Sequence, residues 1–419
     1  MASTRRASRL VPRPARRLYR SWHAERRTLR QGLVALTLST LASFVAGLTL
    51  ASITGTLASL PGLLVLIPAA VGMRGTIFGA IGARLGTASA AGTFEANLRR
   101  GGVLAQNVEV SFITTFTSSL WLAGLAKLAT AAFGEASISF WDLVTISVVG
   151  GFLGSMLILI VTLGLSVVSY RRGYDLDSVA TPMVTALGDM CTLPLLYLAT
   201  FLVHNDLVNA VVAGLCIVLC VLAAVRAWTT RDAQVRRIVL EMTAVIALTP
   251  LLDIAAGALL QAREPGLERL AGLYILIPPF VSQAGALGGI LSSRLSSKLQ
   301  LGVITPSGLP ERPAVLDASI VVALGAVIFT FIGVAGLGLA DLFGMAHPSP
   351  GQMVGGTMLA GLLVMPLILV IGYYIAVLTS RFGLDPDNHA VPIITSVMDL
   401  TGVVAIFVAM SLSGVAIHG

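Results

Sequence analysis

Residues 175–189 read DLDSVATPMVTALGD, and residues 385–399 read DPDNHAVPIITSVMD. Both strings begin with two closely spaced aspartates, carry a proline in the middle and end on an aspartate, at an offset of 399 − 189 = 210. A second pair of strings, 66–85 and 276–295, shares that offset and begins with Leu-Ile-Pro in both copies. Two separate matches at one offset predict that a long structural unit is duplicated within the chain.

The composition places this duplicated unit in a membrane. Of the 419 residues, 56% are hydrophobic and only 11% are charged, and the mean hydropathy is +0.91. Runs such as 33–50, 152–168 and 211–225 contain no Asp, Glu, Lys or Arg. About 20 apolar residues suffice for a helix to cross a hydrocarbon core of about 30 Å. Backbone groups inside lipid must be paired internally, so such runs form helices.

The apolar runs predict an all-α polytopic membrane protein with about eleven spans. Five spans fit each repeat, and one unmatched apolar run at 206–227 lies between the repeats. Five helices would invert the second copy, and the linker helix returns the chain, so the two five-helix repeats are parallel. The predicted spans are 31–55, 62–86, 103–131, 141–169 and 178–203, then 238–261, 271–297, 314–339, 352–379 and 389–417. The predicted domains are a basic tail (1–30), a first repeat (31–203), a linker helix with a loop (204–235) and a second repeat (236–419).

The charges predict the orientation. The net charge is +7, and residues 1–30 hold ten Arg and one Glu, a balance of +9. Such a segment stays on the cytoplasmic side beside anionic lipid, and the Arg-rich loops alternate accordingly. We therefore expect a cytoplasmic (inner) membrane protein with a cytoplasmic N-terminus and an extracytoplasmic C-terminus. Nucleic-acid binding by the tail is not expected. The three cysteines fall in apolar runs, where packing explains them better than metal binding.

Asp189 and Asp399 are the main candidate site residues. Each lies well inside the last predicted helix of its repeat, where an aspartate costs about 2.5–3.5 kcal/mol on insertion scales and usually lines a polar path. The repeat symmetry brings the two carboxylates to equivalent positions around one axis. Thr185 and Thr395 lie one turn earlier on the same helix faces. Oxygen-only ligation suits a hydrated Mg²⁺, although an aspartate that only fixes helix packing is the competing interpretation.

Further polar and small residues are weaker candidates. A possible pore mouth is formed by Asp175, Asp177, Asp385 and Asp387, although helix N-capping explains one aspartate per repeat equally well. Glycine stripes on the second helices predict close helix packing, with Gly72, Gly75 and Gly79 in repeat one and Gly285 and Gly289 in repeat two. Possible accessory residues are Asp253, Asn107, Asp317 and Arg74. Since an unpaired buried arginine is costly, we expect Arg74 to pair with Asp253 or Glu109.

These motifs resemble a known family. The strings 175–189 and 385–399 are similar to the last membrane helix of MgtE-type magnesium channels, and 66–85, with Gly-Met-Arg-Gly at 72–75, is similar to its second helix. The fused double form resembles MgtE-like permeases and the eukaryotic solute-carrier magnesium transporters. The resemblance implies a parallel pair of five-helix units around a pore. It also implies that Asp189 and Asp399 hold a hydrated Mg²⁺.

The sequence departs from this family pattern in two respects. The family's channels carry Gly-Asn in the second helix, whereas this chain has Gly75-Thr76 and Gly285-Ala286. They also carry large cytoplasmic sensor domains, which the short basic tail cannot hold. Divalent-cation transport by a monomer that acts as a pseudo-dimer is therefore the leading hypothesis, with Mg²⁺ as the transported ion and no organic cofactor. An intramembrane aspartyl protease using the same Asp pair, or a non-conducting auxiliary subunit, is the alternative. The sequence does not decide between channel and coupled exchanger.

Overall fold

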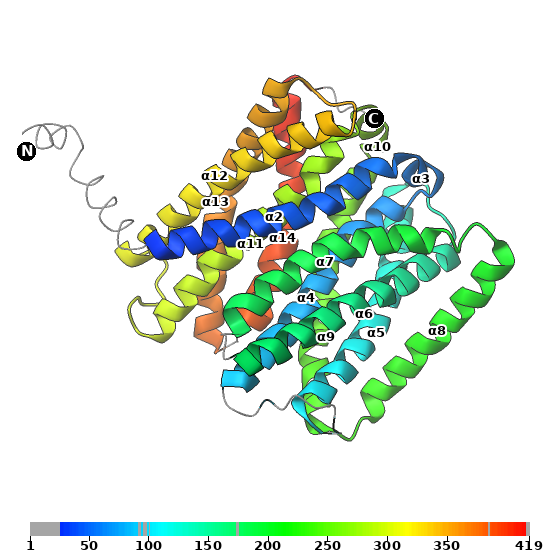
Figure 1. The fold of residues 1–419 in the computed structure, drawn as a ribbon, viewed down its shortest axis with the longest axis horizontal. Helices are drawn as coiled ribbons and strands as arrows, with labels where there is room; N and C mark the ends of the chain where they lie inside the picture. Colours follow the sequence, from blue (N-terminus) through cyan, green and yellow to red (C-terminus); the bar gives the residue numbers. More distant parts are fainter. Residues whose placement is uncertain are drawn as a thin grey trace, which may run out of the picture.

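The chain folds into a bundle of long helices, several of which cross at steep angles, as α2 crosses α14 (Figure 1). The computed structural model describes residues 26–90, 94, 99, 101–172, 176–383 and 386–415. Within those ranges the chain forms helices and turns and no strand. The helices of repeat one are α2 (Arg26–Ser52), α3 (Thr54–Ser59), α4 (Leu63–Ala90), α5 (Val103–Phe133), α6 (Phe140–Arg172) and α7 (Leu176–Thr200). The linker is α8 (Asp206–Thr229), and repeat two holds α9 (Ala233–Gln261), α10 (Glu264–Arg269), α11 (Gly272–Gln300), α12 (Arg312–Leu342), α13 (Pro350–Phe382) and α14 (Pro386–Leu412).

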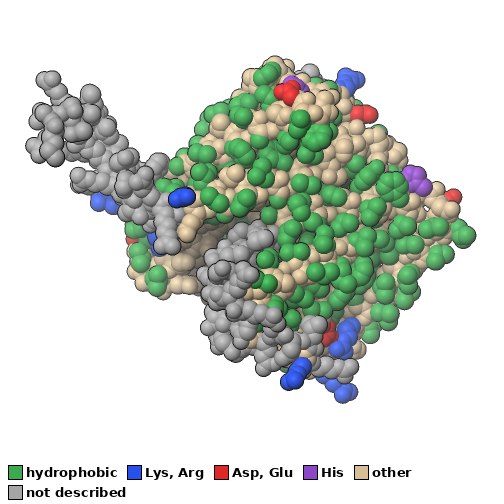
Figure 2. All heavy atoms as spheres, in the orientation of Figure 1, with side chains coloured by type: hydrophobic (Ala, Val, Ile, Leu, Met, Phe, Trp, Pro, Cys, Tyr) green, Lys and Arg blue, Asp and Glu red, His purple; other side chains and the backbone are tan. Residues whose placement is uncertain are grey.

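The helix lengths confirm the predicted all-α polytopic membrane fold. Ten helices of the described part are long and apolar enough to cross a bilayer, and α7 adds a described apolar stretch at Ala186–Thr200. Hydrophobic side chains cover the middle of the molecular face in Figure 2, and charged side chains lie toward its margins. Linker helix α8 stands at one edge of the bundle and exposes large apolar side chains such as Leu207 (76%). This exposure fits a lipid-facing helix.

The two repeats are joined by an exchange of their first helices. Helix α2 packs against α7 of its own repeat and also against α11 of repeat two, and α9 packs against α14 and against α4 of repeat one. Glycines allow both crossings. A Cβ at Gly47 would lie 2.5 Å from the carbonyl oxygen of Ile275, and a Cβ at the equivalent Gly257 would clash with the carbonyl oxygen of Val65. Small residues let helix backbones approach in lipid, where apolar burial alone gives no drive to associate.

Two short helices were not predicted. The expected span 31–55 ends earlier, because α2 stops at Ser52 and the chain turns through α3; α10 occupies the equivalent place in repeat two, at an offset of 264 − 54 = 210. Gly62, with φ of +94°, closes the turn after α3, and its N–H donates to Gln261 Oε1 at 2.7 Å. Helix α2 also begins at Arg26, inside the predicted tail. Residues 1–25 of that tail lie outside the described part of the chain.

The cysteines behave as packing residues. Cys191, Cys216 and Cys220 are buried free thiols, and Cys220 Sγ donates to the carbonyl oxygen of Phe116 at 3.2 Å. The Cys216–Cys220 face of α8 therefore anchors the linker helix on α5.

Candidate cation site between the repeats

Asp189 and Asp399 lie at matching depth in their helices. Asp399 is the central residue of α14, which runs from Pro386 to Leu412. Asp189 lies as many residues after the start of α7 as Asp399 lies after the start of α14. At a rise of about 1.5 Å per residue, each carboxyl is about 20 Å from the helix start. Both helices begin at the Arg-rich end of the bundle. The two carboxyls therefore lie about halfway along helices long enough to cross a bilayer.

The Asp189 carboxylate is held by hydroxyls from both repeats. Ser43 Oγ on α2 donates to Asp189 Oδ2 at 2.7 Å, and Ser282 Oγ on α11 donates to the same oxygen at 2.6 Å. The helix exchange makes this possible, because α11 belongs to repeat two. Asp189 is only 9% exposed. The two hydroxyl donors favour the charged form of this carboxylate, and burial opposes it.

The Asp399 half contains a second carboxyl in place of hydroxyls. The carboxyl of Asp253 on α9 lies within hydrogen-bonding distance of Asp399, and the Ser396 hydroxyl donates to Asp253. Asp253 is 1% exposed, and its Oδ1 is buried without a hydrogen-bond partner among the described residues. Gly72 on α4 leaves room for both groups: a Cβ there would lie 3.0 Å from Asp253 Oδ2 and 3.4 Å from Asp399 Oδ2.

The two halves occupy matching positions but have diverged in chemistry. At the offset of the repeat Asp399 matches Asp189, Asp253 matches Ser43, and Ser282 matches Gly72. One half therefore presents one carboxylate with two hydroxyls. The other presents two carboxyls beside a glycine.

The electrostatics of the site call for a positive charge. Asp399 interacts electrostatically with Asp253 and also with Asp189. Two carboxylates this close must share a proton or have a cation between them. Within the described residues, no group of three His, Cys, Asp or Glu side chains lies close enough to ligate one metal ion directly. The arrangement suits a cation that keeps its water shell, which is the usual behaviour of Mg²⁺ in proteins.

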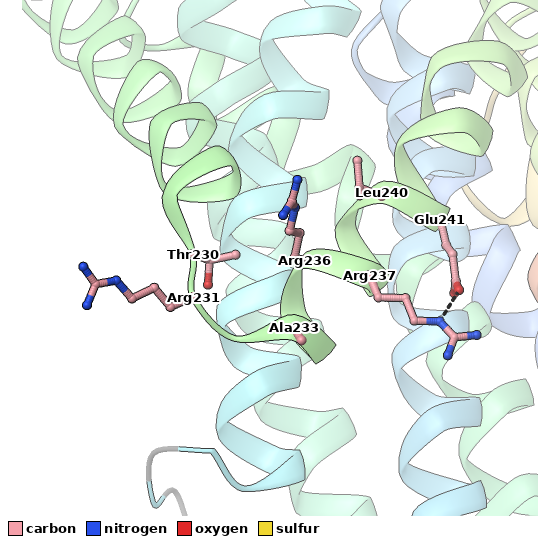
Figure 3. A pocket seen from close by; sticks show the side chains of 7 residues that line it. All are labelled: Thr230, Arg231, Ala233, Arg236, Arg237, Leu240 and Glu241. Atoms are coloured by element: carbon pink, nitrogen blue, oxygen red, sulfur yellow. Dashed lines mark hydrogen bonds and ion pairs between the residues drawn. The ribbon is translucent and has the colours of Figure 1, made fainter.

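Two hollows lie on the Arg-rich side of this cluster. A cavity of about 10 Å³, the volume of about one water-sized sphere, lies between α4, α9 and α14 and is lined by Thr76, Ala80, Arg84, Glu241, Met242, Val245 and His389. The second is an open hollow at the junction of α8 and α9, with Arg231, Arg236 and Arg237 on its rim. In Figure 3 Arg231 points away from the protein, while Arg237 Nε donates to Glu241 Oε1 at 2.8 Å.

Comparison with known proteins agrees with this architecture. The family model "MgtE: Divalent cation transporter" matches the chain twice, over residues 67–199 and 277–409. This chain belongs to the MgtE family of divalent cation transporters. The two matched segments are related by 277 − 67 = 210, which is the offset of the internal repeat. The predicted duplication of an MgtE unit is therefore confirmed.

Curated relatives of this MgtE protein are solute carriers. Solute carrier family 41 member 3 of Rattus norvegicus is 25% identical over 406 residues, covering 90% of this chain and 85% of the relative. Solute carrier family 41 member 2 of Gallus gallus is 26% identical over 369 residues, covering 81% of this chain and 62% of the relative. No solved structure matches the chain. Family and fold together establish a multi-pass membrane protein of a divalent cation transporter family.

Several predicted site residues of this MgtE protein contact residues other than the central carboxyls or lie outside the part of the chain that the structure describes. Thr395 Oγ1 donates to the carbonyl oxygen of Pro392 at 2.9 Å, and its methyl group faces Gly285. Gly289 likewise faces Val391 of α14, so these two glycines pack the second and last helices of repeat two together. Outside the described side chains lie Thr185, Asp175, Asp177, Asp385 and Asp387.

The glycines of the second helix in repeat one differ in their surroundings. Gly72 faces the carboxyl cluster, as described above. At Gly75 a Cβ would meet no atom within 4 Å among the described residues, although Gly188 of α7 lies in ordinary contact with the Gly75 backbone. At Gly79 a Cβ would meet no atom within 4 Å among the described residues. Of the three predicted positions, Gly72 is therefore the one where an added side chain would meet close neighbours among the described residues.

The expected pairing of Arg74 was wrong. Glu109 pairs instead with Arg226 at 2.7 Å, and Asp253 faces Asp399. The Arg74 guanidinium donates to the carbonyl oxygen of Ala70 and packs against α6, where a Cβ at Gly151 would lie 2.5 Å from Arg74 Nη2. A backbone oxygen therefore replaces the expected carboxylate partner.

Asn107 and Asp317 serve local contacts in the MgtE fold. Asp317 is fully buried and pairs with Arg294 Nη2 at 2.7 Å and with Lys298 Nζ at 2.6 Å, which ties α12 to α11. Asn107 Nδ2 donates to the carbonyl oxygen of Val103 at 2.8 Å. Of the four accessory candidates, Asp253 is the one that the structure brings to the central carboxyls. Ser43 and Ser282 complete the site, but no sequence pattern within either repeat marks them as site residues.

Proposed function

We propose that this MgtE protein moves Mg²⁺ across the cytoplasmic membrane through the interface between its two repeats. The observation that supports the proposal is the electrostatic interaction of Asp399 with both Asp253 and Asp189, halfway along the membrane-spanning helices. Hydroxyls hold the carboxylate on one side, and on the other side a carboxyl oxygen has no partner among the described residues. An intramembrane charge of this kind is expensive and usually marks an ion pathway.

The donor set favours a hard divalent ion. All the groups are carboxyl or hydroxyl oxygens, and oxygen ligands suit Mg²⁺ or Mn²⁺ rather than softer ions. A hydrated ion between the halves would make water-mediated contacts with Asp189 on one side and with Asp253 and Asp399 on the other. Three carboxylates exceed the charge of one Mg²⁺, so the complex would retain a negative balance that favours entry of the next cation.

The route follows the helix directions. From the carboxyl cluster, successive turns of α4, α9 and α14 lead to the cavity lined by Thr76 and Glu241 and then to the Arg-rich end, which we infer to be cytoplasmic. That cavity has room for about one water. Opening it requires α4, α9 and α14 to separate at that end.

The working unit we infer is one chain. Each half of the site already draws on both repeats, since Ser282 of repeat two reaches Asp189 of repeat one and Gly72 of repeat one lies beside Asp253 of repeat two. A second chain is not needed to complete it. The family favours this transport function over an aspartyl protease or an auxiliary subunit.

Uptake of Mg²⁺ into proteoliposomes tests the proposal. The Asp189→Ala, Asp399→Ala double variant is expected to lose uptake while the protein remains folded in detergent. Asp341→Asn, at an exposed carboxylate that pairs with His347 outside the bundle, is the matched control and should transport normally. Full uptake by the double variant would remove the proposed site. Chains that are covalently cross-linked and chains isolated as monomers should show the same uptake per chain.

A further inference from the structure

Three glutamates lie near enough to interact electrostatically at the end of the bundle opposite the Arg-rich loops. Glu264 and Glu268 lie on α10, and Glu135 follows α5 in the turn before α6. Gln261 joins the two segments, because its Oε1 accepts from the N–H of Gly62 at 2.7 Å and its Nε2 donates to the carbonyl oxygen of Ala136 at 2.9 Å. The turn that carries Glu135 is thereby fixed beside α10.

The negative charge of Glu264 is opposed, and not stabilised, by burial and by the other two glutamates of this cluster. Burial raises its pKa first, and the nearby charges of Glu268 and Glu135 raise it further. Its Oε1 is buried and has no hydrogen-bond partner in the described part of the chain. Carboxylates that repel one another in this way bind a cation more readily than isolated surface carboxylates.

Tyr274 is a second buried polar group without a partner, and it lies near the same carboxylates. Its side chain is fully buried, with 0% exposure, yet no described residue forms a hydrogen bond with its hydroxyl. That hydroxyl lies close enough to Glu264 and Glu268 to interact with them electrostatically. A buried hydroxyl without a partner is destabilising, so its position beside the carboxylates calls for an explanation.

The symmetry of the chain shows that the fold does not require these residues. At the offset of the repeat, Thr54, Ala58 and Leu64 of repeat one stand in place of Glu264, Glu268 and Tyr274, and Met345 of repeat two stands in place of Glu135. The equivalent short helix α3 forms without acidic residues. Glu264 in the first turn of α10 favours the helix dipole, but that role accounts for neither the tyrosine nor the other two glutamates.

We infer that Glu135, Glu264 and Glu268, with the Tyr274 hydroxyl, form a second binding site for a hydrated divalent cation at the α10 end of the protein. The described carboxylates are not gathered closely enough to ligate one metal directly, so the ion binds through its water shell. Arg263 of the same turn lies over the Phe407 ring, 5.8 Å from its centroid. The positive-inside pattern makes this end extracytoplasmic, where such a site concentrates cations at the outer entrance.

Mn²⁺ binding to the full chain in lipid nanodiscs tests this site, with bound Mn²⁺ measured by electron paramagnetic resonance. All variants carry Asp189→Asn and Asp399→Asn, which removes the central site and separates this inference from the proposed transport route. This background is expected to retain about one Mn²⁺ per chain at low ionic strength. Adding Glu264→Thr and Glu268→Ala, the residues of repeat one, is expected to abolish that binding.

Controls keep the outcome interpretable. Asp206→Asn removes an exposed acidic residue at the start of linker helix α8 and should leave Mn²⁺ binding in the background protein unchanged. Tyr274→Phe keeps the buried ring and should weaken binding by roughly threefold to tenfold, since one hydrogen bond to the hydrated ion is lost. Equal Mn²⁺ binding with and without the two α10 substitutions, or no binding by the background protein, would overturn the inference.

Discussion

Replacement of Asp253 by asparagine separates a cation site from a merely structural polar cluster. The amide keeps the size of the side chain and can still accept from the Ser396 hydroxyl, but it removes the charge that faces Asp399. Without Mg²⁺ the variant should be more stable than the parent, because a buried carboxyl pair is no longer brought together. With Mg²⁺ it should gain less stability than the parent.

The size of the effect follows from the charges. A unit charge pair about 4 Å apart is worth about 1 kcal/mol in water and about 4 kcal/mol at an effective dielectric constant of about 20, and Mg²⁺ is divalent. Loss of one carboxylate should therefore cost at least the roughly 1.4 kcal/mol that corresponds to a tenfold weaker affinity. At a Mg²⁺ concentration of about 100 times the parent Kd, binding stabilises the parent by about 2.7 kcal/mol and the variant by only about 1.4 kcal/mol.

The assay is thermal unfolding of the purified protein in detergent across a Mg²⁺ series. Asp317→Asn is the matched control, because Asp317 is also a buried aspartate and its repeat-one equivalent is already Asn107. This control should lower stability by breaking the contacts with Arg294 and Lys298, yet keep the full Mg²⁺ shift. An Asp253→Asn protein with the parent's Mg²⁺ shift and the parent's stability without Mg²⁺ would refute the assignment.

Three further predictions concern the contacts around the site. Ser282→Ala removes one of the two hydroxyls on Asp189 and should weaken Mg²⁺ transport, with the loss seen as a higher half-saturating concentration in proteoliposome uptake. Gly257→Ala forces a methyl group onto a backbone carbonyl at the crossing of the repeats and should lower the free energy of unfolding by about 1–3 kcal/mol in denaturant titrations. Gly151→Ala should destabilise by a similar amount, because the added Cβ would lie 2.5 Å from both Arg74 Nη2 and Ser119 Oγ. In a double-mutant cycle with Arg74→Ala the two losses in the free energy of unfolding should sum to more than the loss of the double variant, and simple additivity would argue against the Arg74 contact.

The internal repeat made much of the fold and part of the site predictable. One constant offset indicated the five-helix unit, the unmatched linker helix and the equivalence of Asp189 with Asp399, because those features are present in both copies. Span boundaries agreed to within a few residues, since hydropathy changes sharply where a helix leaves the membrane.

Features that depend on contacts between the repeats were not predictable in the same way. Ser43 and Ser282 are ordinary residues in their own helices and become site residues only because α2 and α11 both lie against α7. Arg74 was expected to pair with a carboxylate, but its guanidinium donates to a backbone oxygen and packs against the glycines of α6. Helices α3 and α10 are too short to give a hydropathy signal of their own.

Fusion of the two units explains why the site is asymmetric. A symmetric dimer of identical chains would have the same residue at equivalent positions of both halves. With aspartate at the position shared by Asp253 and Ser43, the centre would hold four carboxyls, and with serine there it would hold only two. The fused chain avoids that constraint and places Ser43 and Ser282 beside one aspartate and Asp253 beside the other. Three carboxylates can hold a divalent ion with one charge left over, whereas four would need a second cation or protons to remain buried. Divergence of the copies therefore sets the charge of the pathway independently of the fold that both copies share.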